Sequence, residues 1–80
     1  MMVARQKLTH LDHEVLLHKD QHELARQWCH EQFGLRWNPL DNRSGRWAMF
    51  WAGRDRFDQY RFCFADKEDM LMFILRWGHE

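Results

Sequence analysis

The stretch that decides the fold is GRWAMFWAGRDRFDQYRFCFADKEDMLMFILRWG, from Gly45 to Gly78. It begins with an apolar run, residues 47–51, that is too short for a helix and rich in the aromatic residues that suit a sheet. Residues 60–64 then place Tyr60, Phe62 and Phe64 on one face, because successive side chains of a strand point to opposite sides. The polar segment 52–59 joins the two runs, so the pattern predicts a β-hairpin.

A helix is predicted directly after the hairpin. Asp66 is its expected N-cap and Gly78 its expected end. Apolar residues recur between them at spacings of three and four: Met70, Phe73, Ile74 and Trp77, with Leu71 and Leu75 widening the stripe. We expect this helix to cover the face that carries Tyr60, Phe62 and Phe64, because that is the more apolar face of the hairpin.

The first half of the chain predicts a strand and a helix. Residues 14–18 form a short apolar run, and Asp20 with Glu23 three residues later gives a start of the capping-box type. The helix is expected to end at Gly34 and to bury one face: Leu24, Ala25, Trp28, Cys29 and Phe33. An alternative is one continuous helix over residues 11–33, against which the Asp20 cap argues. Residues 35–44 are predicted to be a loop that Trp37 and Leu40 pin to the core.

These elements predict one small α+β domain with the order β-α-β-β-α. We expect a three-stranded sheet with two helices on one face, which is the ferredoxin-like or split βαβ arrangement without its last strand. Residues 1–12 are expected to be a flexible N-terminal tail. Such a sheet would leave one edge and one face uncovered, and both are places where another protein or another copy of the chain could bind.

Charge and composition narrow the class of function. The 80-residue chain has 12 basic and 12 acidic residues, so no overall field attracts nucleic acid or a membrane surface. Arginine outnumbers aspartate between Leu35 and Cys63, which gives that segment a local positive charge. No apolar run approaches the roughly 20 residues that span a bilayer, and we expect a cytoplasmic protein, in the host cytoplasm if it is viral.

The sequence shows no enzyme signature, and we expect neither a cofactor nor a metal. His18 and His22 have the spacing of two ligands on one helix face, but the predicted cap at Asp20 separates them and no CxxC or HExxH motif is present. No serine has a glycine-flanked elbow, and no phosphate-binding loop occurs. Cys29 and Cys63 are expected to be reduced packing residues.

Two resemblances suggest what the chain binds. The segment QYRFCF, residues 59–64, in a β-α-β-β-α order resembles the third strand of an RNA-recognition motif, in which aromatic rings stack on bases. Arg61 and Ala65 depart from that motif, and the fourth strand is missing. The segments WAMFWAGRD and YRFCFADKEDMLMFILRWG resemble the small accessory proteins of tailed phages. That resemblance implies a protein that acts by binding, as an inhibitor of a host or defence enzyme or as an assembly component.

The sequence therefore predicts a non-enzymatic protein-binding module that modulates a protein partner. Tryptophan and arginine dominate the energy of many interfaces, and the predicted partner-binding residues are Trp37, Arg43, Arg46, Trp51, Arg54, Arg56 and Phe57. Self-association through the sheet is a further expectation. The alternatives are a single-stranded nucleic-acid-binding protein that uses the same hairpin and a small self-assembling structural component.

Overall fold

The computed structural model describes residues 10–78 of the chain. The elements are β1 (His13–His18), α1 (Lys19–Phe33), β2 (Trp47–Trp51), the short 3₁₀ helix η1 (Arg54–Arg56), β3 (Gln59–Phe64) and α2 (Lys67–Trp77). Of the predicted tail, residues 1–9 lie outside the described residues. Residues 10–12 are placed against the domain: Leu11 is buried, and His10 Nε2 lies 2.9 Å from the carbonyl oxygen of Gly45.

The three strands form one antiparallel sheet in the order β1-β3-β2. Phe62 of β3 lies between Val15 of β1 and Met49 of β2, which fixes the register across all three strands. Because β1 and β2 both run antiparallel to β3, they are parallel to each other and are connected through α1. This is the predicted split βαβ topology, and the predicted α+β class with a three-stranded sheet and two helices is confirmed.

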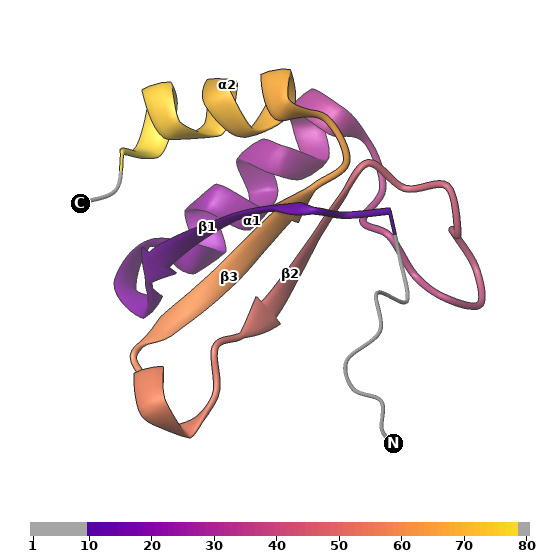
Figure 1. Cartoon of the computed structure of the whole chain (residues 1–80). Helices are drawn as coiled ribbons and strands as arrows, with labels where there is room; N and C mark the ends of the chain where they lie inside the picture. The colour runs from indigo at the N-terminus through magenta and orange to yellow at the C-terminus, as the bar shows by residue number, and fades with distance from the viewer. Residues whose placement is uncertain (1–9, 79–80) are drawn as a thin grey trace.

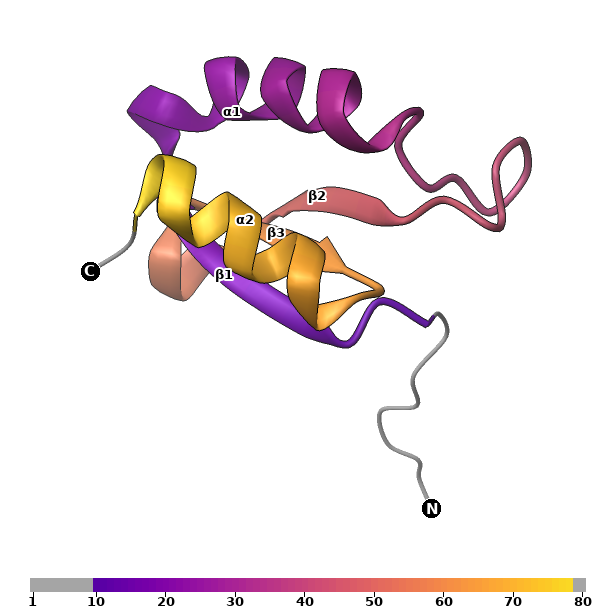
Figure 2. The ribbon, with the colours of Figure 1, turned by 90° about the horizontal axis from the view of Figure 1, so that it is seen from above.

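Both helices cover the same face of the sheet (Figures 1 and 2). The alternation of side chains directs Val15, Leu17, Trp47, Phe62 and Phe64 toward the helices, and all five are buried. The prediction that β3 turns its aromatic face to the helices is therefore correct. Helix α2 packs over β1 and β3, and α1 contacts all three strands.

Phe73 of α2 is the centre of the core. Its ring centroid lies 4.8 Å from that of Phe62, 5.2 Å from that of Phe64 and 6.1 Å from that of Trp28. Edge-to-face and tilted contacts at these distances are the favourable arrangements for aromatic rings. One side chain therefore joins α2, β3 and α1.

The other face of the sheet has a small second core at one end. Leu11, Ala48 and Cys63 are buried there, and Trp37 and Ala65 pack against them. The predicted helix-free face is thus partly covered by the segment before β1 and by the loop after α1. The other end of the helix-free face, around Leu16, Phe50 and Arg61, is not covered by the residues of the second core.

The start of α1 differs from the prediction. The N-cap is His18 rather than Asp20: its Nδ1 accepts a hydrogen bond of 3.1 Å from the backbone N–H of Asp20. The helix therefore begins directly at the end of β1, and the continuous helix over residues 11–33 is excluded because residues 13–18 form a strand. Gly34 and Gly78 end the two helices as predicted. Asp66 is the N-cap of α2, although its side chain makes no capping hydrogen bond.

Four leucines predicted to be in the core are exposed. Leu24 is 63% exposed, Leu71 is 44% exposed, and Leu40 and Leu75 are each 86% exposed. The sheet is only three strands wide, so each helix can bury only a narrow stripe, and Leu24, Leu71 and Leu75 lie outside it. Leu40 lies at the turn between the bridged residues Asn38 and Asn42 and points away from the core.

Backbone contacts and asparagine side chains hold the loop between α1 and β2. The Asn42 side-chain amide donates to the carbonyl oxygens of Leu35 and Arg36, and Asn38 Oδ1 accepts from two backbone N–H groups of the turn. The Trp37 N–H donates to the Trp47 carbonyl oxygen at 2.7 Å, at the outer edge of β2. Gly45 allows this approach, because a Cβ atom there would lie 2.6 Å from the Cα atom of Trp37.

Candidate protein-binding surface

The hairpin tip, residues 51–58, brings four of the predicted partner-binding residues together: Trp51, Arg54, Arg56 and Phe57. All four are exposed, with exposed fractions of 51% for Trp51 and 66% for Phe57. These are the aromatic and basic residues that the sequence analysis selected from this segment. Their grouping follows from the antiparallel pairing of β2 with β3.

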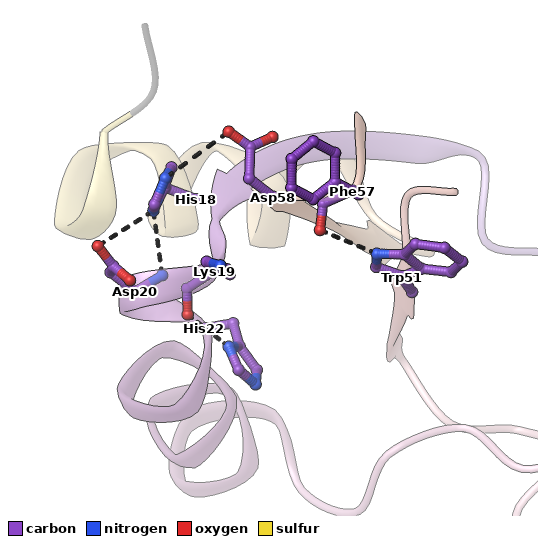
Figure 3. A network of polar contacts seen from close by, with 7 residues as sticks. All are labelled: His18, Lys19, Asp20, His22, Trp51, Phe57 and Asp58. Atoms are coloured by element: carbon purple, nitrogen blue, oxygen red, sulfur yellow. Dashed lines mark hydrogen bonds and ion pairs between the residues drawn. The ribbon is translucent and has the colours of Figure 1, made fainter. Parts of the chain in front are cut away.

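Trp51 and Phe57 are joined across the tip. The indole Nε1 of Trp51 donates to the Phe57 carbonyl oxygen at 3.0 Å (Figure 3). Trp51 is on the helix-facing side of β2 by alternation with Trp47 and Met49, but it is the last residue of the strand and remains half exposed. The hydrogen bond fixes its polar end and leaves ring surface in contact with solvent.

Glycine and a short helical turn shape the tip. Gly53 has φ +102°, a conformation that residues with a Cβ rarely adopt. The N–H of Arg56 donates to the Gly53 carbonyl oxygen at 3.1 Å and closes η1, which carries Arg54 and Arg56. The N–H of Ala52 donates to the carbonyl oxygen of Gln59 and continues the ladder up to this turn.

Asp58 attaches the tip to the junction of β1 and α1. Its carbonyl oxygen accepts from the N–H of Lys19 at 2.8 Å, and its Oδ2 lies 3.8 Å from His18 Nε2 (Figure 3). His18 Nδ1 meanwhile accepts from the backbone N–H of Asp20, so His18 both caps α1 and faces Asp58. The exposed aromatic rings are therefore carried on a loop that is hydrogen-bonded at both ends.

The other three predicted partner-binding residues lie elsewhere. Trp37 is half-buried in the second core, and Arg43 is exposed in the loop before β2. Arg46 immediately precedes β2 at the end opposite Trp51, which is about 16 Å away for a strand of this length. The predicted set is thus divided between the two ends of β2.

The Arg46 side chain is 51% exposed, but its guanidinium group forms an ion pair with a buried carboxylate. Its Nε and NH2 donate to the two carboxylate oxygens of Asp69 at 3.1 and 2.8 Å, and Asp69 is only 4% exposed. The guanidinium carbon also lies 5.3 Å from the centroid of the Phe33 ring. A bidentate pair with a buried carboxylate docks α2 on the start of β2, so we place Arg46 in the structure of the domain rather than in the candidate surface.

A second row of contacts crosses the helix-free face and was not predicted from the sequence. Arg61 NH1 lies 3.6 Å from Glu14 Oε2, and its guanidinium carbon lies 5.9 Å from the centroid of the Phe50 ring. Phe50 is 39% exposed. The register places Leu16, Arg61 and Phe50 side by side on three strands. The only sequence signal for this row was the alternation that set Arg61 opposite to Tyr60 and Phe62.

The aromatic rings that resemble the RNA-recognition motif face the helices. Phe62 is fully buried, and Tyr60 is partly buried with its ring stacked on His22 at a centroid distance of 4.1 Å. His22 also interacts through Nδ1 with the carbonyl oxygen of Lys19 at 2.6 Å. Neither ring of β3 is therefore presented on the helix-free face for base stacking.

The two cysteine side chains pack in the two cores of the domain. Both cysteines are free and buried. Burial raises the pKa of the Cys29 thiol to about 12 and that of Cys63 to about 11, with further increases from the carboxylates of Asp69 and Glu14 respectively. Thiols with raised pKa values are poor nucleophiles at neutral pH. Within residues 10–78, no three His, Cys, Asp or Glu side chains gather as metal ligands.

Comparison with known proteins gives no relative: no family model, no curated protein and no solved structure matches this chain. Among the described residues, no helix combines the length and the apolar character that crossing a membrane requires.

Proposed function

We propose that the protein is a non-enzymatic binding module that recognises a protein partner through its hairpin tip. The observation that supports this proposal is the pair of exposed aromatic residues, Trp51 and Phe57, held together by a hydrogen bond and flanked by Arg54 and Arg56. Tryptophan and arginine are the residues most enriched among those that dominate interface energies.

The hydrogen bonds that fix the conformation of the hairpin tip support the proposal. Binding costs free energy for every side chain and loop that must be immobilised. Here the Gly53 turn, the Trp51–Phe57 hydrogen bond and the link from Asp58 to Lys19 hold the loop before any partner arrives. A preformed aromatic pair at a protruding turn suits insertion into a hollow on a folded partner.

The tip also suits a protein better than nucleic acid. Asp55 and Asp58 accompany Arg54 and Arg56, so the segment carries no net charge that would attract a phosphate backbone. The mode of action expected from the resemblance to phage accessory proteins, steric or allosteric inhibition of a host or defence enzyme, stays a prediction.

The first test is affinity capture from cell lysate with matched baits. One bait is the wild type, and the second carries Trp51→Ala with Phe57→Ala. The control carries Leu35→Ala with Leu40→Ala, which removes two exposed apolar side chains from the loop at the other end of β2. We expect one stoichiometric protein to bind the wild type and the control. Affinity for the tip variant should fall at least about 30-fold, as for the loss of a hot spot.

Charge reversal gives a second pair of baits. Arg54→Glu with Arg56→Glu should abolish capture while the free energy of unfolding changes by less than about 0.5 kcal/mol, because both side chains are exposed. Arg36→Glu with Arg43→Glu makes the same change of charge in the other loop and should retain capture. Equal loss in both variants would show that net charge rather than the tip controls binding.

A nuclease-treated sample of the same lysate distinguishes protein binding from the alternative, binding of single-stranded nucleic acid. If the captured material is nucleic acid, it disappears with nuclease, and its affinity falls steeply with salt. That outcome would contradict the proposal. Capture of the same protein by the wild type and the Trp51→Ala/Phe57→Ala variant would contradict it as well.

A further inference from the structure

The outer edge of β1 has no strand beside it among residues 10–78. The Lys19 N–H donates to the carbonyl oxygen of Asp58, the residue opposite in register. Hydrogen-bonded pairs alternate along an antiparallel ladder, so the odd-numbered residues of β1 bond to β3. The backbone N–H and C=O groups of Glu14 and Leu16 and the N–H of His18 therefore point to the free edge.

The opposite edge of the sheet is not equivalent. On β2 the carbonyl oxygen of Trp47 faces outward and already accepts the N–H of Trp37. The loop after α1 thus covers the start of that edge. Among the residues described, β1 is the longer unprotected template for another strand.

A groove runs along this edge beneath the end of α2. Its volume is about 960 Å³, and it is lined by β1, by Ile74, Trp77 and Gly78 of α2 and its cap, and by Gln21 and Gln59. The Nε1 of Trp77 and the Oε1 of Gln59 are buried there without a hydrogen-bond partner among residues 10–78. The groove therefore offers an unpaired strand edge under an apolar overhang.

We propose that the groove is filled by β1 of a second copy, which forms a twofold symmetric dimer with a continuous six-stranded sheet. The symmetry axis passes Leu16, so that Leu16 faces Leu16 of the second copy and Glu14 faces its His18. In this register the outward N–H and C=O groups of Glu14 and Leu16 lie opposite residues of the second copy whose own backbone groups also point outward, so the two strands can hydrogen-bond. Registers shifted by one residue would direct these groups against residues that bond to β3.

The side chains are complementary in the same register. On the helix-facing side Val15 meets Leu17 of the second copy, so the buried apolar row of β1 continues across the axis. On the helix-free side the Glu14 carboxylate of each copy lies opposite the His18 imidazole of the other copy. The register therefore places no two groups of like charge directly opposite each other. Opposite-charge and apolar cross-strand pairs stabilise a sheet.

Helix α2 supplies the second layer of the interface. Its positions 71, 74, 75 and 78 form one stripe by helical spacing, and Ile74 and Gly78 of this stripe line the groove. Leu71 and Leu75, which are 44% and 86% exposed, complete it. Because α2 lies over β1 and β3 and neighbouring strands are about 4.8 Å apart, the two copies of α2 would be roughly 10 Å apart, which is the distance of packed helices. In Figure 2, no other described helix lies on the side of α2 that faces away from α1.

Sedimentation velocity of the full chain over a wide concentration range tests the proposal. We expect twice the monomer mass for the wild type and the monomer mass for Leu16→Pro. Proline removes the outward N–H of Leu16, which β3 does not use, so the variant should keep its fold and its circular dichroism spectrum. Leu71→Glu with Leu75→Glu should also give monomers. Leu24→Glu on α1, at a side chain 63% exposed, is the matched control and should remain dimeric.

Disulfide formation tests the register. Leu16→Cys should cross-link to its own copy on mild oxidation, because the axis brings the two residues opposite each other. Phe50→Cys lies on the same face of β2 and should not cross-link, and the native cysteines are buried. A monomer at all concentrations, a dimer that persists in Leu16→Pro, or cross-linking of Glu14→Cys instead of Leu16→Cys would overturn the proposal. None of these results depends on the hairpin tip.

Discussion

Cys29 and Cys63 are among the most deeply buried small side chains of the chain, 0% and 5% exposed. We predict that iodoacetamide at pH 8 labels neither thiol in the native protein and labels both after denaturation, as measured by mass spectrometry. Ser44→Cys, at an exposed loop position, is the positive control and should react in the native state. Rapid native labelling of Cys29 or Cys63 would contradict the packing.

The same two thiols should make the protein sensitive to alkali. Their pKa values are raised from 9.0 to about 12 and about 11 in the folded state. Between pH 9 and these values the unfolded chain loses thiol protons that the folded chain retains, so the free energy of unfolding falls as pH rises. Cys63→Ala should reduce this slope in urea titrations at pH 8 and pH 10.

At the scale of elements, Phe73 is the fully buried side chain by which α2 packs on the sheet, and the ion pair between Asp69 and Arg46 is a further contact. Phe73→Ala should lower the free energy of unfolding by about 3–5 kcal/mol, since it removes a fully buried ring from contacts with Phe62, Phe64 and Trp28. Leu24→Ala removes an exposed side chain and should change it by less than about 0.5 kcal/mol. Urea midpoints measure both, and equal effects would contradict the assigned core.

The elements themselves could be read from the sequence because their signals are local. Alternation at residues 60–64 and three-and-four spacing at residues 70–77 gave the correct strand and helix. The sequence analysis predicted the wrong N-cap for α1 because aspartate is a better N-cap than histidine by residue type. In the structure, the hydrogen bond from the N–H of Lys19 to the carbonyl oxygen of Asp58 keeps the chain paired with β3 up to Lys19, so the helix begins at Lys19 and His18 is its N-cap. A tertiary hydrogen bond decided between two local solutions.

At the scale of the whole molecule, the proposed partner-binding surface and the proposed dimer interface lie on different parts of the sheet. The hairpin tip joins β2 to β3, and the proposed dimer edge is β1, so a dimer would carry two accessible tips. We predict that Leu16→Pro weakens binding to a densely immobilised partner by about 100-fold or more, because the avidity of two linked sites is lost. Binding of partner in free solution, measured by calorimetry per tip, should be unchanged. A similar loss in both formats would show that the β1 edge itself contacts the partner.

The candidate site was only half predictable for a related reason. Residue type selected Trp51, Phe57, Arg54 and Arg56 as partner-binding residues, and the structure shows all four exposed around the hairpin turn. The same criterion selected Arg46, whose guanidinium group pairs with Asp69, a residue of α2 that is 23 positions later in the sequence. It also selected Trp37, which packs beside Leu11 and Cys63. Which arginine is free depends on the carboxylates that folding brings near it, and single-residue patterns do not contain that information.

The sequence by itself determined the order of the elements, the face of β3 that meets the helices, and the hairpin with its exposed tip. Each of these depends on periodicity and turn residues within a few positions, where backbone geometry and side-chain type act directly. The tertiary structure decided that Asp69 forms an ion pair with Arg46, that Trp37 packs in the second core, and that a groove beneath the end of α2 runs along the edge of β1. Those outcomes come from contacts between distant residues, whose energies depend on packing that no local segment specifies.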